Sequence, residues 1–422
     1  MQSRQPVISK KILLPFILIT SLFFMWGLAN NMTDTLLAAF KRIMSMSDFQ
    51  TSWIQIAFYG SYFCLALPAA LLIKRYTYKT GVLTGLGLFV AGALLFYPAS
   101  QTMVYGHFLA ALFVLAGGLS ILETSSNPYV ITMGSEETGT QRLNLAQSFN
   151  PIGSITGVFL SKYFILANLN TASEAERALM PAGELQEIQA AELNAVMGPY
   201  VGVAAILLLV WVAIAVTKMP EVKDEDKQNT DFFGTLKRLI HNKNYRQGVM
   251  AQFFYVGAQI GVWSFTIRYV MLELNVNEGQ ASTYYLAALI LFTISRFLFT
   301  GLMKFFKPGI LLTLSALMAI ISTLFVVFGK GLFGVISLVA ISGFMSLMFP
   351  TIYGISVRGL GDDTKIGGSG LIMAILGGAA LTAIQGQVSD LTGNIHYAFF
   401  VPAACFVIIA GYGLVAAKRN RE

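Results

Sequence analysis

Charged residues are scarce in this sequence. Only 12% of its 422 residues are charged, whereas about 25% is usual in soluble proteins. Hydrophobic residues make up 55%, and the mean hydropathy is +0.67. Such a chain cannot cover its surface with groups that water solvates, which excludes a disordered chain and an ordinary soluble enzyme. The composition therefore predicts an all-α polytopic membrane protein.

Cysteine, histidine and catalytic motifs are also scarce. Cys64 and Cys405 both lie inside apolar runs, where we expect free thiols. The three histidines are dispersed and show no metal-ligand spacing. The sequence has no phosphate-binding loop, which argues against an ATP-driven pump. It also has no H-E-x-x-H motif and no G-x-S-x-G elbow, which argues against a membrane hydrolase. We expect no enzyme activity, no metal and no cofactor.

The positions of the basic residues indicate how the chain is oriented in a membrane. The net charge of +7 could suggest a nucleic-acid partner, but the lysines and arginines form short runs between apolar segments, such as Lys10-Lys11 and Lys74-Arg75. If the N-terminus is inside, most of these runs fall on the cytoplasmic side. We therefore expect a multi-pass protein of the cytoplasmic (inner) membrane, with both termini cytoplasmic and no nucleic-acid partner.

Twelve apolar runs are long enough to cross a bilayer. We predict spans at about 12–38, 51–73, 80–99, 104–131, 143–168, 195–217, 247–272, 281–305, 310–329, 331–355, 366–389 and 396–416. The first run continues into Asn30-Asn31-Met32-Thr33-Asp34 without a small-residue cleavage site, so we expect it to be a retained span rather than a signal peptide.

A basic polar stretch lies near the middle of the chain. We predict that residues 218–246 form a cytoplasmic linker between an N-terminal half, 1–217, and a C-terminal half, 247–422. Weak internal matches support a duplication: they pair Phe23–Gly27 with Phe253–Gly257, Leu72–Lys74 with Leu302–Lys304, and Asn127-Pro128 with Phe349-Pro350. Their common order predicts two pseudo-symmetric six-helix halves.

Three charged residues lie well inside the predicted spans, namely Asp34, Glu123 and Arg296. A charge in hydrocarbon costs roughly 2.5–3.5 kcal/mol on insertion scales, so such residues usually serve a function. Glu123 is the deepest, and desolvation favours its neutral form, so it could exchange a proton or accept a hydrogen bond from a sugar hydroxyl. The alternative is a protonated structural residue.

Asp34 and Asn31 are three residues apart and share a helix face. We expect Asp34 to handle a proton, although a helix cap is the alternative. Arg296 could pair with a carboxylate or an anionic substrate, or it could bind a loop or lipid phosphate near the cytoplasmic end. The sequence leaves that choice open.

Amides and aromatic residues complete the candidate site. Asn144, Gln147 and Asn150 form a stripe that suits a neutral polyhydroxylated ligand, with interhelical packing as the alternative. We expect Gln147 and Asn150 to contact the ligand more directly than Asn144. Gln259 is predicted to line the cavity, and Trp26 is the best aromatic candidate for stacking on a sugar ring.

Five segments resemble the fucose–galactose–glucose branch of the major facilitator superfamily, and the resemblance covers nearly the whole chain. They are Phe23–Asp34, Leu122–Pro128, Arg142–Asn150, Tyr255–Gln259 and Gly359–Lys365. The resemblance implies twelve helices, a central cavity between two halves and alternating access. It also implies proton coupling through Asp34, sugar and proton handling by Glu123, and sugar-facing side chains at Asn31, Gln147 and Asn150.

These features together predict a monomeric secondary transporter in the lipid bilayer. We expect it to import a neutral monosaccharide, L-fucose or a related hexose, with a proton as the coupling ion. A sodium-coupled glucose, galactose or amino-sugar transporter of the same fold is the first alternative, and a non-sugar efflux transporter is the second. Ser125-Ser126 and the outer loop 169–194 depart from the branch's pattern, which leaves the identity of the sugar open.

Overall fold

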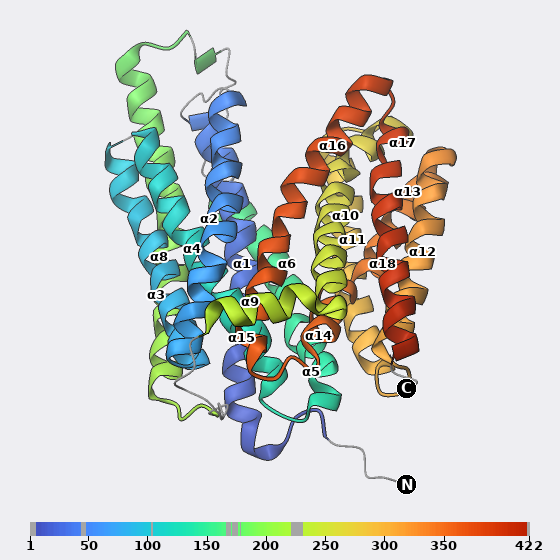
Figure 1. The fold of residues 1–422 in the computed structure, drawn as a ribbon. Coiled ribbons are helices and arrows are strands. Elements are labelled where there is room, and N and C mark those ends of the chain that lie inside the picture. The colour runs from blue at the N-terminus through green and yellow to red at the C-terminus, as the bar shows by residue number, and fades with distance from the viewer. Residues whose placement is uncertain are drawn as a thin grey trace.

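A computed structural model describes residues 6–43, 48–102, 104–165, 176–177, 179–220 and 231–419, together with Asn170. The side chains of 33–43, 48–52, 55, 56, 162, 182 and 193–196 are outside the description. All regular structure in the described part of the chain is helical, which confirms the predicted all-α class (Figure 1).

The helices of the first part of the chain are α1 (Leu13–Ile43), α2 (Asp48–Arg75), α3 (Tyr78–Thr102), α4 (Tyr105–Thr132), α5 (Gly139–Gln147), α6 (Asn150–Leu160) and α8 (Ala182–Val216). Those of the second part are α9 (Phe232–His241), α10 (Lys243–Leu274), α11 (Glu278–Leu302), α12 (Pro308–Phe328), α13 (Gly331–Met345), α14 (Met348–Val357), α15 (Thr364–Met373), α16 (Gly377–Thr392), α17 (Ile395–Ala398) and α18 (Phe400–Arg419).

Within the described residues, 10 helical stretches are long and apolar enough to cross a membrane. The other two predicted spans correspond to α5 with α6 and to α10. Helix α5 is short and polar, and α10 carries Lys243, Arg246, Arg268 and Glu273. Both lie among the other helices and complete the expected order of twelve spans (Figure 1).

Four predicted spans are not continuous α-helices. The span 366–389 is interrupted by a 3-10 turn at Ala374–Leu376, and the span 396–416 is divided between α17 and α18. In the other two spans the break lies close to a proline. The chain breaks between α5 and α6 at Ser148, and between α13 and α14 at Ser346. Pro151 and Pro350 follow these breaks. Proline has no backbone N–H, so the carbonyl four residues earlier loses its helical partner.

The helices pack as two groups. Helices α1 to α8 contain most of one apolar core, and a second core is built entirely from residues of α10 to α18. The groups touch where α5 packs against α14 and where α15 packs against α2 and α4. These contacts lie at the end of the molecule that also holds both termini and the connecting helix α9 (Figure 1).

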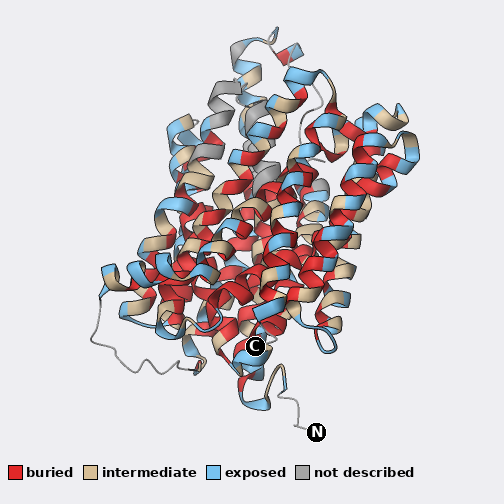
Figure 2. Cartoon of the chain, turned by 45° about the vertical axis from the view of Figure 1, so that its right-hand side comes forward, coloured by how far each residue is buried: buried red, intermediate tan, exposed pale blue. Residues whose placement is uncertain are grey.

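The outer surface of the bundle is apolar. Figure 2 shows buried residues concentrated in the interior and exposed residues along the outside. Many of the exposed side chains are large and hydrophobic, for example Ile294 at 61% and Leu298 at 59%. A soluble protein rarely exposes so much contiguous apolar surface, so these faces suit contact with lipid.

Candidate functional site

A cavity of about 700 Å³ lies between the two helix groups. Six of the residues that the sequence singled out line it: Trp26, Asn31, Glu123, Gln147, Asn150 and Gln259. Arg296 lines it as well. The structure therefore brings these residues together around one space, while their roles stay predictions. Asp34 lies on α1, and its side chain falls outside the described residues.

Asn150 reaches the cavity because α1 and α6 cross closely. A Cβ atom added to Gly27 would lie 1.9 Å from the carbonyl oxygen of Asn150, and one added to Gly153 would lie 1.9 Å from that of Phe24. Only glycine permits this approach. The Asn150 amide then donates to the carbonyl of Phe23 over 3.1 Å, which fixes it at the first turn of α6.

Glu123 is buried on α4, with only 2% of its surface exposed. Its Oε1 accepts a hydrogen bond from the hydroxyl of Tyr62 on α2 over 2.9 Å. Ser120 donates to the backbone carbonyl of Tyr62 over 3.0 Å and so holds α2 against α4. The sequence analysis did not identify Tyr62 as the partner of Glu123, because sixty-one positions separate the two residues.

Gln147 is connected to the same helix. Its Nε2 donates to Asn127 Oδ1 over 2.8 Å, and Asn127 in turn donates to the backbone carbonyl of Glu123 over 3.1 Å. Gln147 is therefore linked through Asn127 to the backbone of Glu123. Hydrogen-bonded networks hold side chains in a fixed arrangement when all members are satisfied.

Several polar atoms at the cavity wall have no hydrogen-bond partner among the described residues. They are Glu123 Oε2, Trp26 Nε1, Asn30 Oδ1 and Thr382 Oγ1. Leaving a buried polar group unpaired costs about 1–3 kcal/mol, so such atoms mark a place for water or a ligand. Thr382 on α16 was missed by the sequence analysis, since a threonine in an apolar helix gives no signal of its own.

Aromatic side chains line the cavity on both sides. Trp26 stacks on Phe23 with ring centroids 5.9 Å apart, and Trp263 meets Phe292 edge-on at 5.1 Å. Tyr59 also lines the cavity. By contrast, Tyr62, Tyr255 and Tyr353 are buried and are not among the residues that line it.

Hydrogen bonds join the two helix groups between this cavity and the end of the molecule that carries the termini. Asn144 Nδ2 donates to Thr351 Oγ1 over 3.2 Å, and Gln141 donates to the carbonyl of Thr300 over 2.9 Å. The backbone N–H of Gly359 donates to Glu136 over 2.8 Å. Asn144, which we expected to be further from the ligand than Gln147, thus connects α5 to α14.

Arg296 also connects the groups, because its guanidinium donates to the backbone carbonyls of Gln147 and Ser346. The sequence offered a carboxylate, an anionic substrate, or a loop or lipid phosphate as its partner. Among the described residues its hydrogen-bond partners are backbone carbonyls instead. A sequence pattern cannot reveal such partners, because every residue has a carbonyl.

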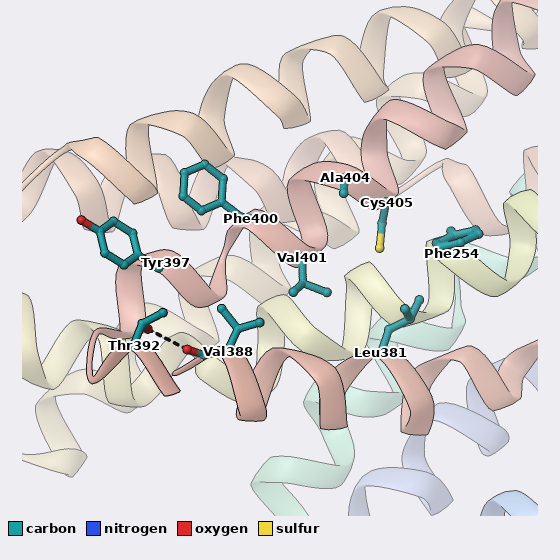
Figure 3. Close-up of a pocket in the computed structure, with 9 residues that line it drawn as sticks. All are labelled: Phe254, Leu381, Val388, Thr392, Tyr397, Phe400, Val401, Ala404 and Cys405. Carbon is teal, nitrogen blue, oxygen red and sulfur yellow. Dashed lines mark hydrogen bonds between the residues drawn. The ribbon is translucent and has the colours of Figure 1, made fainter. Parts of the chain in front are cut away.

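A second cavity of about 530 Å³ lies between α10, α16, α17 and α18 (Figure 3). Its lining is almost entirely apolar, and the hydroxyl of Thr392 is occupied by the carbonyl of Val388 over 2.6 Å. None of the predicted site residues lines it. Polar ligands therefore have little to bind there, and the cavity between the groups is the candidate site. No cluster of three potential metal ligands occurs within the described residues.

Comparison with known proteins agrees with this architecture. Residues 16–383 match the Major Facilitator Superfamily family model. The chain is 41% identical to the L-fucose-proton symporter of Haemophilus influenzae, over 98% of each chain. It is 34% identical to a glucose/galactose transporter of Brucella abortus, over 95% of this chain and 93% of that one.

A solved structure is similar over nearly the full length. The crystal structure of the major facilitator transporter FucP in the outward conformation superposes with a TM-score of 0.92 at 39% identity. The match covers 96% of this chain and 99% of that chain.

Proposed function

Because the chain belongs to the major facilitator superfamily, we propose that it imports a neutral monosaccharide, L-fucose or a related hexose, together with a proton by alternating access. The relatives at 40–41% identity are L-fucose-proton symporters. The observation that carries the proposal is Glu123, a buried carboxylate on the cavity wall with one oxygen bonded to Tyr62 and the other unpartnered among described residues.

The cavity has the chemistry of a sugar site. A sugar hydroxyl is both donor and acceptor, so it can donate to Glu123 Oε2 and accept from amide or indole N–H groups. Asn31, Gln147, Asn150 and Gln259 supply amides, and Trp26 supplies an aromatic face for the apolar side of the ring. Among the described residues that line the cavity, only Glu123 and Arg296 carry a charge, which favours a neutral substrate.

Proton coupling is assigned to Asp34 and Glu123. A carboxylate that takes a proton loses its charge, and this lowers the cost of closing the cavity around it. In the proposed cycle, protonation and sugar binding precede closure at the far end, and the groups then separate at the end near the termini. The bonds from Asn144 and Gln141 to the second group must break at that step.

Several features of topology belong to the same proposal. The boundaries are 1–217, 218–246 and 247–422, with both termini cytoplasmic in the inner membrane and a monomer as the working unit. The hydrogen bonds between groups at the terminal end support an arrangement closed toward the cytoplasm and open outward. No cofactor is needed, because the gradient of the coupling ion drives transport.

Uptake into proteoliposomes tests the proposal directly. We expect labelled L-fucose to accumulate when the inside is alkaline and sodium is absent, and accumulation to disappear when a protonophore removes the gradient. Accumulation only under an inward sodium gradient would instead support the sodium-coupled alternative. Saturable binding of apolar drugs without any sugar uptake would support the efflux alternative.

A further inference from the structure

Arg296 carries a charge that the proposed cycle does not use. It lies in α11, only 4% of its surface is exposed, and it lines the cavity. The ion pairs between described residues are Arg177–Glu192, Arg238–Asp363 and His396–Glu273, so none of them neutralises it. Its Cζ lies 4.5 Å from the centroid of the Phe292 ring. A buried cation without a carboxylate needs another source of compensation.

Two backbone carbonyls, each left without a helical partner by a proline, provide that compensation. Arg296 Nε donates to the carbonyl of Ser346 over 2.6 Å, and Nη1 donates to that of Gln147 over 3.0 Å. These residues lie four positions before Pro350 and Pro151. They are therefore the carbonyls that an ordinary residue at each proline position would occupy with its own N–H. The guanidinium takes the place of two missing backbone donors, one in each helix group.

These two hydrogen bonds leave Nη2 of the Arg296 guanidinium without a described partner. The guanidinium is planar, so fixing Nε and Nη1 also fixes the direction of Nη2. No described residue accepts a hydrogen bond from Nη2, whereas Arg296 is part of the cavity wall. The second helix group thus holds one immobilised, charged donor in a residue that lines the cavity, while the first group carries the unpartnered oxygen of Glu123.

We propose that Arg296 is a substrate-binding residue whose Nη2 donates to a sugar oxygen, and that the carbonyls freed by Pro151 and Pro350 hold it in position. This role rests on the proposed function and names the donor that the C-terminal wall contributes. It also gives the two breaks next to Pro151 and Pro350 a common role, because each leaves a carbonyl that the same guanidinium binds. The bond to Gln147 joins opposite groups, so opening toward the cytoplasm separates the donor from one anchor.

Isothermal titration of the purified full-length protein with L-fucose tests the role. Because a hydrogen bond from a charged group is lost, we expect Arg296→Gln and Arg296→Lys to bind about tenfold to a hundredfold more weakly. Lysine keeps the charge but lacks the planar, rigid set of donors that holds the guanidinium in one orientation. Arg268→Gln is the matched control, because Arg268 is exposed on α10 and outside the cavity lining.

Analogues of L-fucose that each lack one hydroxyl separate contact from a structural effect. The loss caused by Arg296→Gln should largely vanish for the one analogue that lacks the bonded oxygen. Affinity equal to wild type in both variants, or the same loss for every analogue, would overturn the role. Absence of any L-fucose binding by the wild-type protein would overturn the proposed function and this role with it.

The prolines give a second test that removes no polar side chain. Pro350→Ala restores an N–H that competes for the Ser346 carbonyl, so we expect about threefold weaker binding as Arg296 loosens. Pro98→Ala is the control, since Pro98 lies inside α3 and away from the cavity. Identical affinity in the two proline variants would contradict the anchoring by the freed carbonyl.

Discussion

The two walls of the cavity differ in how their polar groups are held. On the wall from α1, α4, α5 and α6, Glu123 is bonded to Tyr62, and Gln147 is bonded to Asn127. The wall from α10, α11 and α16 is richer in apolar side chains, among them Val256, Ile260, Leu289 and Phe292. Its charge, Arg296, is held by backbone carbonyls.

This difference indicates that the two walls have different roles in binding. A connected network of side chains is suited to selecting a pattern of hydroxyl groups, because moving one member disturbs the others. An apolar wall can shift against a sugar ring at little cost, since dispersion contacts have no strict direction. We therefore expect substitutions on the first wall to cost more than substitutions on the second, with Arg296 as the exception.

The largest effect is expected from Asp34→Asn. An amide cannot carry the coupled proton, so the variant should lose accumulation of L-fucose in proteoliposomes under a proton gradient. It should keep the exchange of labelled for unlabelled sugar, which needs no net proton movement. Asp390→Asn is the control, because Asp390 is exposed on α16 outside the cavity. Continued uphill accumulation by Asp34→Asn would show that the coupling assignment is wrong.

A smaller effect is expected from Tyr62→Phe. The change removes the hydrogen bond to Glu123 but keeps the aromatic ring, so L-fucose affinity should fall about threefold to tenfold. Tyr255→Phe is a matched control, since Tyr255 is equally buried and donates to the carbonyl of Met345 away from the cavity lining. Equal losses in the two variants would show that the first network has no special role in binding.

The contact between the two helix groups at the terminal end is tested by Asn144→Leu. Loss of its bond to Thr351 should favour opening toward the cytoplasm, because the bond exists only while the groups are closed at that end. One neutral hydrogen bond corresponds to about a twofold to tenfold change in the ratio of conformers. Alkylation of single cysteines introduced on the cytoplasmic faces of α5 and α14 measures that ratio. Unchanged or slower alkylation would argue against this closure contact.

The smallest effect is expected from Thr382→Val. The substitution keeps the shape of the side chain and removes one hydroxyl from the apolar wall. We expect L-fucose affinity to fall by no more than about threefold, as for a single neutral hydrogen bond. A loss larger than that of Tyr62→Phe, measured in the same titrations, would reverse the proposed comparison of the walls.

Much of this arrangement could be predicted from the sequence, because a polar residue in an apolar run is conspicuous. Glu123, Gln147 and Gln259 were identified in this way, and all three line the cavity. The order of helices followed from hydropathy, with α10 and α5–α6 recognised although they are the more polar spans.

Other features could not be read from the sequence, for physical reasons. Tyr62 and Thr382 look like ordinary residues of membrane helices, and only the packing of α2 and α16 gives them a role. The partners of Arg296 are backbone carbonyls, which no residue type reveals. The prolines at 151 and 350 were visible, but their effect depends on α11 lying between the two broken helices.

The most direct test of the central claim compares the wild-type protein with Glu123→Gln in L-fucose titrations from mildly acidic to mildly alkaline pH. We predict that wild-type affinity falls as pH rises, because the sugar binds with a proton. The variant should bind at least about tenfold more weakly and lose the part of the pH dependence that Glu123 supplies, since an amide does not titrate. Unchanged affinity together with an unchanged pH profile would contradict the claim that sugar and proton meet at Glu123.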